Sequence, residues 1–169
     1  MNLNSLQELF IDKLQDIYTA ERKTEDLLPR FAEKCSSDEV RKAFSEHLEQ
    51  SRNQVTRLEQ VFSKLDMKPQ IRENPVIDSL IEESREYLDS EGDAKVKDAA
   101  LIAAEQEIEH YEISAYGTAR SFARALGMDD VAGILQETLN EEEFTDSRLS
   151  KIAEKGDGGP AINQEAAHR

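Results

Sequence analysis

The chain has 169 residues, of which 38% are hydrophobic and 34% are charged, and its formal net charge is −15 at pH 7. This length suits one domain with a substantial buried core. The excess of acid argues against a surface for nucleic acid or for an anionic membrane, because both need a positive footprint. The composition predicts a soluble protein, or one that attracts cations.

Targeting signals and cysteine chemistry are also restricted. No apolar run approaches the roughly 18 residues of a membrane span. The first residues, "MNLNSLQELF", lack the basic start and the apolar stretch of a signal peptide. The single cysteine, Cys35, excludes an internal disulfide and a cysteine-based zinc or iron–sulfur site. We therefore expect a cytoplasmic protein.

The first long amphipathic segment covers residues 6–31. Ser5 and Glu8 have the spacing of a capping box, which predicts the start of a helix. Near the other end, Pro29 removes a backbone donor and is expected to kink or end the last turn.

A second helix is predicted from "SSDEVRKAF" to about residue 65, where Ser36 and Glu39 form another capping box. A long link, residues 66–93, follows it. Within the link, "NPVIDSLIEESREYL" has the apolar spacing of a shorter helix, and its Asn-Pro pair suits a helix start.

Two more long helices complete the predicted domain. Residues 94–126 form one, which Gly127 ends as a C-cap, and the other begins near Asp129 and ends before "GDGG". We expect a helical domain over residues 1–154 and a disordered tail over residues 155–169.

The connections predict the topology. Only a few residues join the first long helix to the second, and the third to the fourth, so each pair forms an antiparallel hairpin. Two hairpins joined by one long crossover is the connectivity of ferritin-like bundles. The sequence thus predicts an all-α, ferritin-like four-helix bundle whose crossover carries a fifth, shorter helix.

The stretch "EIEHYEISAYGT" raises the question of which acids point inward, since a helix turns roughly 100° per residue. Glu105 and Glu112 lie within roughly 40–60° of the centre of the apolar stripe. Glu109 lies at its margin, while Glu107 and His110 point away. The stretch therefore divides into inward and surface residues.

The other long helices show the same feature. In "NEEEF", Glu142 falls almost on the axis of the apolar stripe, and Asp146, one turn later, also leans inward. Glu21 flanks the stripe of the first helix. The inward polar residues of the second helix are His47, Ser51 and Gln54.

Every long helix thus carries a polar or acidic residue on its apolar side near mid-length. Burying an unpaired carboxylate costs several kcal/mol, and several together repel one another unless they are protonated or bound to a cation. Oxygen-rich clusters completed by histidine suit iron or manganese. Carboxylates converging from four helices are the arrangement of bundle sites that hold two ions.

Four blocks, "LQDIYTAE", "AFSEHLEQS", "DAALIAAEQEIEHYEISAYGT" and "LQETLNEEEFTDSRL", resemble the YciE/YciF-type ferritin-like proteins of bacteria. The matching blocks span about residues 3–153, and the third block is the most specific. The resemblance implies a bundle similar to rubrerythrin, a homodimer, a role in stress responses and a di-metal centre.

Carried over by position, the resemblance implies Glu21 as the carboxylate of the first helix, Glu109 and Glu112 as those of the third, and Glu142 and Asp146 as those of the fourth. The chain departs from the wider di-iron pattern, which repeats Glu-x-x-His on two helices. His47 is the one plausible nitrogen ligand. The candidate metal ligands are Glu21, His47, Gln54, Glu109, Glu112, Glu142 and Asp146.

Three functions stay open. The leading hypothesis is a di-metal oxidoreductase of the peroxidase, catalase or ferroxidase type, with peroxide or ferrous iron as its substrate. The second is a metal-poor structural or interaction homodimer, in which His47 is a core histidine bonded to Gln54 or to a carboxylate. Glu105 is expected to be an inter-helix salt-bridge partner. Iron storage in a cage is the third.

Overall fold

A computed structural model describes residues 4–168 of the chain, and its described residues form helices and no strands. The helices are α1 (Leu6–Lys34), α2 (Asp38–Lys64), α3 (Pro75–Asp89), α4 (Ala94–Ala125), α5 (Asp129–Glu154) and α6 (Ile162–Ala167). Within this described part, no helix combines the length and the apolar character needed to cross a membrane.

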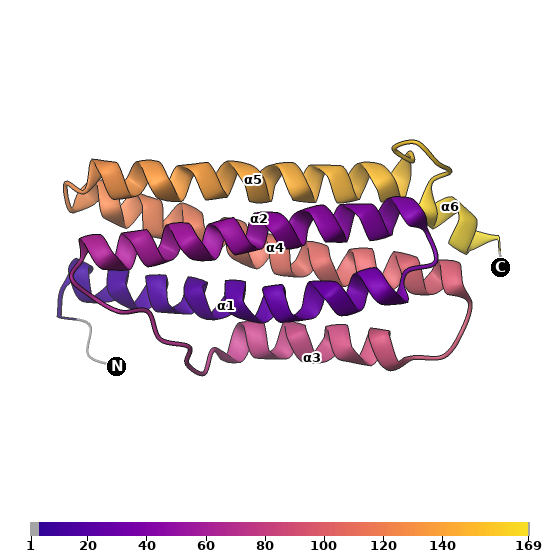
Figure 1. Ribbon diagram of the computed structural model, residues 1–169, viewed down its shortest axis with the longest axis horizontal. Coiled ribbons are helices and arrows are strands. Elements are labelled where there is room, and N and C mark those ends of the chain that lie inside the picture. Colours follow the sequence, from indigo (N-terminus) through magenta and orange to yellow (C-terminus); the bar gives the residue numbers. More distant parts are fainter. Residues whose placement is uncertain (1–3, 169) are drawn as a thin grey trace.

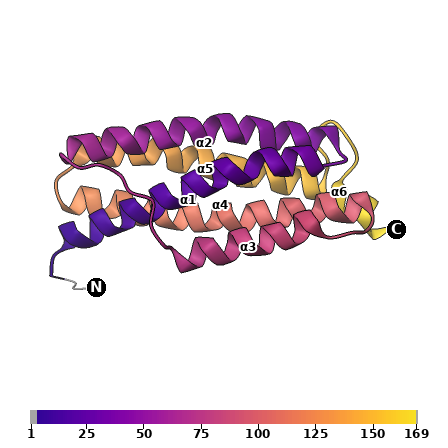
Figure 2. The ribbon, with the colours of Figure 1, turned by 60° about the horizontal axis from the view of Figure 1, so that its bottom comes forward.

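The four long helices form one bundle built from two hairpins (Figure 1). Helix α1 pairs with α2, and α4 pairs with α5. Helix α3 returns along the bundle and packs against α1 and α4, on the side away from α2 and α5 (Figure 2). The predicted ferritin-like connectivity and the fifth, shorter helix in the crossover are confirmed.

The helix ends follow the predicted signals, with one change of residue. The hydroxyl of Ser5 accepts a hydrogen bond from the backbone N–H of Glu8, 3.1 Å away. At α2 the N-cap is Ser37 and not Ser36. Ser36 instead donates its hydroxyl to the buried carboxylate of Asp98 on α4, at 2.6 Å. The hydrogen bond from Ser36 to Asp98 thus leaves Ser37 to cap α2, although the two adjacent serines look equivalent in the sequence.

Of the two effects predicted for Pro29, ending the first helix is wrong, because α1 continues to Lys34. Proline costs the helix one backbone hydrogen bond. Burial on either side outweighs that loss, since Leu28 and Phe31 are both 0% exposed. The ladder resumes beyond the proline, where the N–H of Cys35 donates to the carbonyl of Phe31 at 3.1 Å.

Beyond Glu154, where the sequence predicts a disordered tail, the chain turns and forms α6, which packs against α4 and α5. Gly156, at φ +74°, makes the turn that sends the chain back. Burial of Ile162, 1% exposed, anchors α6. An ion pair of 3.1 Å between Lys95 and Glu165 adds a second contact. The apolar pattern of α6 is too short to predict a helix after a glycine-rich turn.

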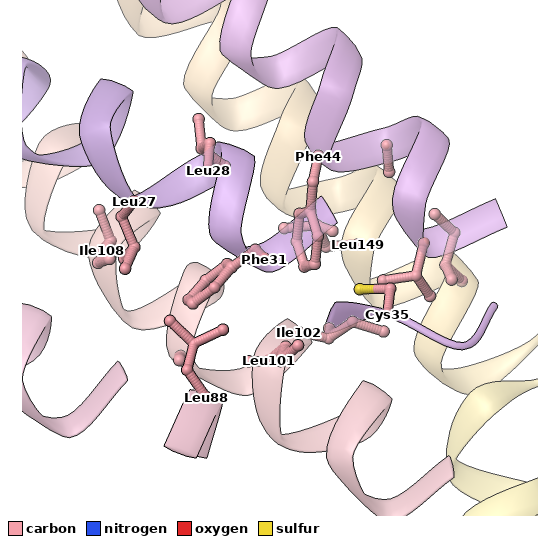
Figure 3. Close-up of a cluster of buried hydrophobic side chains, with 14 of the residues drawn as sticks. Leu27, Leu28, Phe31, Cys35, Phe44, Leu88, Leu101, Ile102, Ile108 and Leu149 are labelled. Carbon is pink, nitrogen blue, oxygen red and sulfur yellow. The ribbon is translucent and has the colours of Figure 1, made fainter. Parts of the chain in front are cut away.

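The core consists of two apolar clusters stacked along the bundle axis. One, shown in Figure 3, lies towards the α1–α2 turn and contains Phe31, Phe44 and Leu149. The other lies towards the α4–α5 turn and contains Phe10 and Phe62. Buried polar residues separate the two clusters on each long helix, so a polar layer crosses the middle of the bundle.

Asp98 gives a test of how the two hairpins are held together. Its buried carboxylate accepts three hydrogen bonds from Ser36 and Ser37. We expect Asp98→Ala to lower the free energy of unfolding by roughly 3 kcal/mol, because three donors lose a charged partner. The control Asp89→Ala removes a 74% exposed carboxylate and should change stability by less than about 0.5 kcal/mol. Urea denaturation measures both, and equal effects would contradict this role.

Candidate metal centre

The polar layer contains five buried glutamates and one buried histidine. Each long helix contributes at least one of them, and α4 contributes three. All six side chains are at most 2% exposed. They are Glu21 on α1, His47 on α2, Glu105, Glu109 and Glu112 on α4, and Glu142 on α5. This set is called the carboxylate cluster below.

His47 lies at the centre of one half of the cluster. Its Nδ1 hydrogen bonds to Oε1 of Glu105 at 2.7 Å and lies 3.1 Å from Oε1 of Glu109. Its Nε2 lies 3.8 Å from Oε2 of Glu142 and has no hydrogen-bond partner. Metal-binding histidines commonly use one ring nitrogen for the ion and the other for a carboxylate. His47 has this arrangement.

The other half of the cluster is held by hydroxyl groups. Tyr116 donates to Oε1 of Glu21 at 2.5 Å, and Ser51 donates to Oε2 of the same carboxylate at 3.0 Å. Thr24 donates to Glu112 at 3.3 Å. These bonds fix the direction of both carboxylates from neighbouring helices. Because a hydroxyl brings no net charge, they orient the acids without neutralising them.

The cluster lacks balancing cations. In the described part of the chain, no lysine or arginine forms an ion pair with any of the five glutamates, and His47 is their one ion-pair partner. Several of their oxygens also lack a hydrogen-bond donor. These are both carboxylate oxygens of Glu109, both of Glu142 and Oε2 of Glu105. Buried acceptors without partners are costly, so the arrangement calls for protons or a cation.

Burial and neighbouring carboxylates raise the pKa values of Glu21, Glu109 and Glu112. Burial, followed by the charge of Glu142, raises the pKa of Glu21 to about 8, despite the opposing bonds from Tyr116 and Ser51. Burial and neighbouring carboxylates raise the pKa of Glu109 and of Glu112 well above the ordinary value.

Glu142 and His47 link the two halves electrostatically. Burial raises the pKa of Glu142, although the charge of His47 opposes this. Burial alone would lower the pKa of His47, but its hydrogen bond with Glu105 and the charges of Glu105, Glu142 and Glu21 raise it. The charge of Glu142 in turn raises the pKa of Glu21, Glu109 and Glu112. Glu142 is therefore the carboxylate that both halves share.

The donor set fits a hard or borderline cation. One atom each from His47, Glu109 and Glu142 lies within 4.8 Å of the other two, and all three side chains are buried. Carboxylate oxygens with one imidazole are ligands that suit iron and manganese. The unpartnered Nε2 of His47 and the free oxygens of Glu109 and Glu142 provide the donor atoms.

Five of the seven predicted ligands belong to the carboxylate cluster, whereas Asp146 and Gln54 do not. Asp146 is 22% exposed and accepts a hydrogen bond from Gln106 at 2.9 Å, on the outer side of the α4–α5 contact. One helical turn after Glu142 rotates a side chain by about 40°, which is enough to carry it out of the core. Gln54 is buried, but its amide nitrogen donates to Glu141, 3.1 Å away.

Some residues of the layer were not among the predicted ligands. Glu105 was expected to be an inter-helix salt-bridge partner, and the structure pairs it with His47 across α2 and α4. It lies one and two turns before Glu109 and Glu112 on the same face of α4, a spacing that could have placed it in the site. No sequence pattern marks the hydroxyls of Thr24 and Tyr116 as partners of carboxylates, because both also suit ordinary packing.

Four long helices in two hairpins, with a carboxylate–histidine layer between two apolar clusters, define a ferritin-like protein with a candidate metal site. Residues 5–167 match the family described as a domain of unknown function, DUF892, and the chain belongs to this family. It is 39% identical over 154 residues to Protein YciF of Escherichia coli (strain K12), covering 90% of this chain and 93% of that protein. The resemblance found in the sequence is confirmed.

Solved structures agree with this assignment. YcfI from Rhodopseudomonas palustris superposes with a TM-score of 0.87 at 37% identity, covering 90% of this chain and 98% of that one. The E. coli stress protein YciF gives a TM-score of 0.84 at 37% identity, with 88% and 94% covered. A dodecameric thioferritin from Bacteroides fragilis gives 0.66 at 18% identity, with 97% and 89% covered, which shows the shared fold alone.

The raised pKa values predict that the metal-free protein loses stability as pH rises. A carboxyl whose pKa is about 8 when folded, against 4.5 when unfolded, stabilises the fold fully below the lower value and loses that contribution as pH passes the higher one. The raised pKa of His47 acts in the same direction. Urea midpoints measured in chelator should therefore fall between about pH 5 and pH 8.

The variant Glu21→Gln tests the cause of this pH dependence. A neutral amide has no proton to lose, so the fall in stability with pH should become shallower than in the unchanged protein. An unchanged slope in this variant, or stability that rises over the same range, would contradict the assignment of a protonated Glu21 in the metal-free fold.

Proposed function

We propose that the protein is a di-metal carboxylate protein of the bacterial stress response, which binds iron or manganese and acts on peroxide or ferrous iron. The observation that carries the proposal is the charge imbalance of the carboxylate cluster. Five buried carboxyl groups face one imidazole, and the described residues supply no lysine or arginine to neutralise them. The relationship to the E. coli stress protein YciF supports the physiological context.

Each half of the cluster would hold one ion. His47, Glu109 and Glu142 form the first set of ligands, and Glu21 and Glu112 form the second, again with Glu142. Tyr116 and Ser51 keep the carboxylate of Glu21 directed into the layer. Glu105 orients the ring of His47. Gln54 and Asp146, also predicted as ligands, stand outside both sets.

The protein itself supplies binding, orientation and exclusion of water. The apolar clusters above and below the layer keep bulk water from the carboxylates, which strengthens their attraction for a cation. Iron or manganese, when bound, would supply the change of oxidation state that reduction of peroxide or oxidation of ferrous iron requires. The hydroxyl partners carry no net charge, so they orient the carboxylates without competing with a cation for them.

The second candidate function is a metal-poor structural or interaction protein. Buried carboxyl groups can be held by protons: burial raises the pKa of Glu21 to about 8, and the pKa values of Glu109 and Glu112 are raised in the same direction, which supports this candidate. The relative YcfI carries a provisional description as a structural protein. A homodimer in the cytoplasm belongs to both candidates, and Phe144, 63% exposed on α5, is a side chain that an interface could cover.

Metal content decides between the two candidates. After separate loading with Fe²⁺ and Mn²⁺ and desalting, we expect mass spectrometry to find about two ions per chain. The double variant Glu112→Leu/Glu142→Leu should retain none, because it removes ligands from both halves. The matched control, Glu107→Leu/Glu143→Leu, changes exposed glutamates on the same two helices and should keep the metal.

The free energy of unfolding of the same variants tests the two candidate functions independently. Bound metal at about 100 times its dissociation constant should stabilise the unchanged protein by roughly 3 kcal/mol, and the double variant should lose this effect. A protein that retains no metal, and whose double variant is more stable by roughly 1–4 kcal/mol in chelator, would instead be the structural candidate.

A further inference from the structure

One ion pair closes the seam between α2 and α5 beside the carboxylate cluster. The guanidinium of Arg57 on α2 makes two hydrogen bonds, each of 2.6 Å, to the two carboxylate oxygens of Glu141 on α5. Glu137, one turn earlier on α5, lies 3.7 Å from the same guanidinium. The side chains of Arg57 and Glu141 are 23% and 29% exposed, so the pair touches both solvent and the interior.

On their buried side, Arg57 and Glu141 hydrogen bond to two buried polar side chains, Thr138 and Gln54. Arg57 also contacts the hydroxyl of Thr138 at 3.4 Å, and Glu141 accepts a hydrogen bond from the amide of Gln54 at 3.1 Å. Thr138 and Gln54 are each 1% exposed. Thr138 lies one turn before Glu142 on the same face of α5.

Only one end of the side-chain amide of Gln54 takes part in a hydrogen bond. The residue lies on the same face of α2 as His47, two turns away, with Ser51 between them. Its Nε2 is used by Glu141, but its buried Oε1 has no hydrogen-bond partner. Burying an amide oxygen without a hydrogen-bond donor costs free energy, unless a cation or a water molecule binds to it. Along α2, Gln54 lies between His47 of the cluster and Arg57 of the ion pair.

Helices α2 and α5 pack against each other on the side of the bundle away from α3. Helix α3 packs over α1 and α4 on the opposite side (Figures 1 and 2). Another ion pair across the seam, between Lys64 and Asp130 at 2.7 Å, lies at the end of α2 and touches no residue of the polar layer. The Arg57–Glu141 pair is thus distinguished by its contact with buried polar side chains.

We propose that the Arg57–Glu141 ion pair is an electrostatic gate through which divalent cations reach the carboxylate cluster, with Oε1 of Gln54 as the first interior oxygen on the route. The inference rests on the proposed metal-binding function. When the pair opens, Glu141 and Glu137 attract the cation, and the guanidinium of Arg57 opposes it. The gate therefore sets the rate of metal uptake without supplying a ligand to the bound ion.

Variants that change the charge of the ion pair in opposite directions distinguish an electrostatic gate from a general weakening of the α2–α5 contact. Arg57→Gln breaks the pair and leaves two uncompensated carboxylates, so Fe²⁺ uptake should become faster by roughly tenfold. Glu141→Gln breaks the same pair but leaves the positive guanidinium, so uptake should become slower by a similar factor. The double variant should fall between them. All three differences should shrink at about 1 M salt, because screening weakens exposed charges.

The measurement is the rate at which anaerobically added Fe²⁺ becomes resistant to an external ferrous chelator, together with the Fe²⁺ content at equilibrium. The matched control is Lys64→Gln, which breaks another α2–α5 pair and should leave the rate unchanged. Thermal unfolding confirms that each variant is folded. The equilibrium content should be the same in all variants, since none of the changed residues is a proposed ligand.

The possible results are distinguishable. Opposite changes in rate at constant content support the gate. Changes in the same direction for Arg57→Gln and Glu141→Gln, or rates equal to that of Lys64→Gln, overturn it while the metal site stands. Absence of Fe²⁺ from the unchanged protein at equilibrium overturns the proposed function, and the gate with it.

Discussion

The rest of the structure depends on a concentration of negative charge that the fold places where water cannot reach it. Five glutamates from three helices surround one histidine of the fourth, and every one of these side chains is nearly fully buried. Carboxylates in such a place repel one another and lose their hydration, which the raised pKa values of Glu21, Glu109 and Glu112 express. The layer is stable only with protons or cations, so its occupancy and the stability of the bundle are linked.

The apolar core is arranged around this layer. Phe31 and Phe44 belong to the cluster on one side, and Phe10 and Phe62 to the cluster on the other. The two clusters supply the packing that the polar layer lacks, and they hold the four helices in register so that the carboxylates meet. Helix α3 covers the face formed by α1 and α4, and the α2–α5 contact lies on the opposite side of the bundle.

Helical periodicity identified much of the layer in advance. It placed Glu112 and Glu142 inward, and the structure buries both. It treated Glu109 as marginal, although that side chain is 0% exposed, and it turned Asp146 inward, although that residue bonds to Gln106 on the outer side. Such errors arise at the edges of the apolar stripe. There a rotation of about 40° separates core from surface, and only the neighbouring helix decides which side is covered.

The sequence by itself determined the class of fold, because apolar spacing, helix caps and loop lengths are local properties that specify two hairpins and a long crossover. It also determined that acids would face inward near mid-length on three of the long helices, and His47 on the other. The tertiary structure alone decided which groups meet: the bond of His47 to Glu105, that of Tyr116 to Glu21, and the closure of a seam by Arg57 and Glu141. These contacts join residues 58, 95 and 84 positions apart, and such distances carry no local signal. Only the packing of one helix against another brings the partners together.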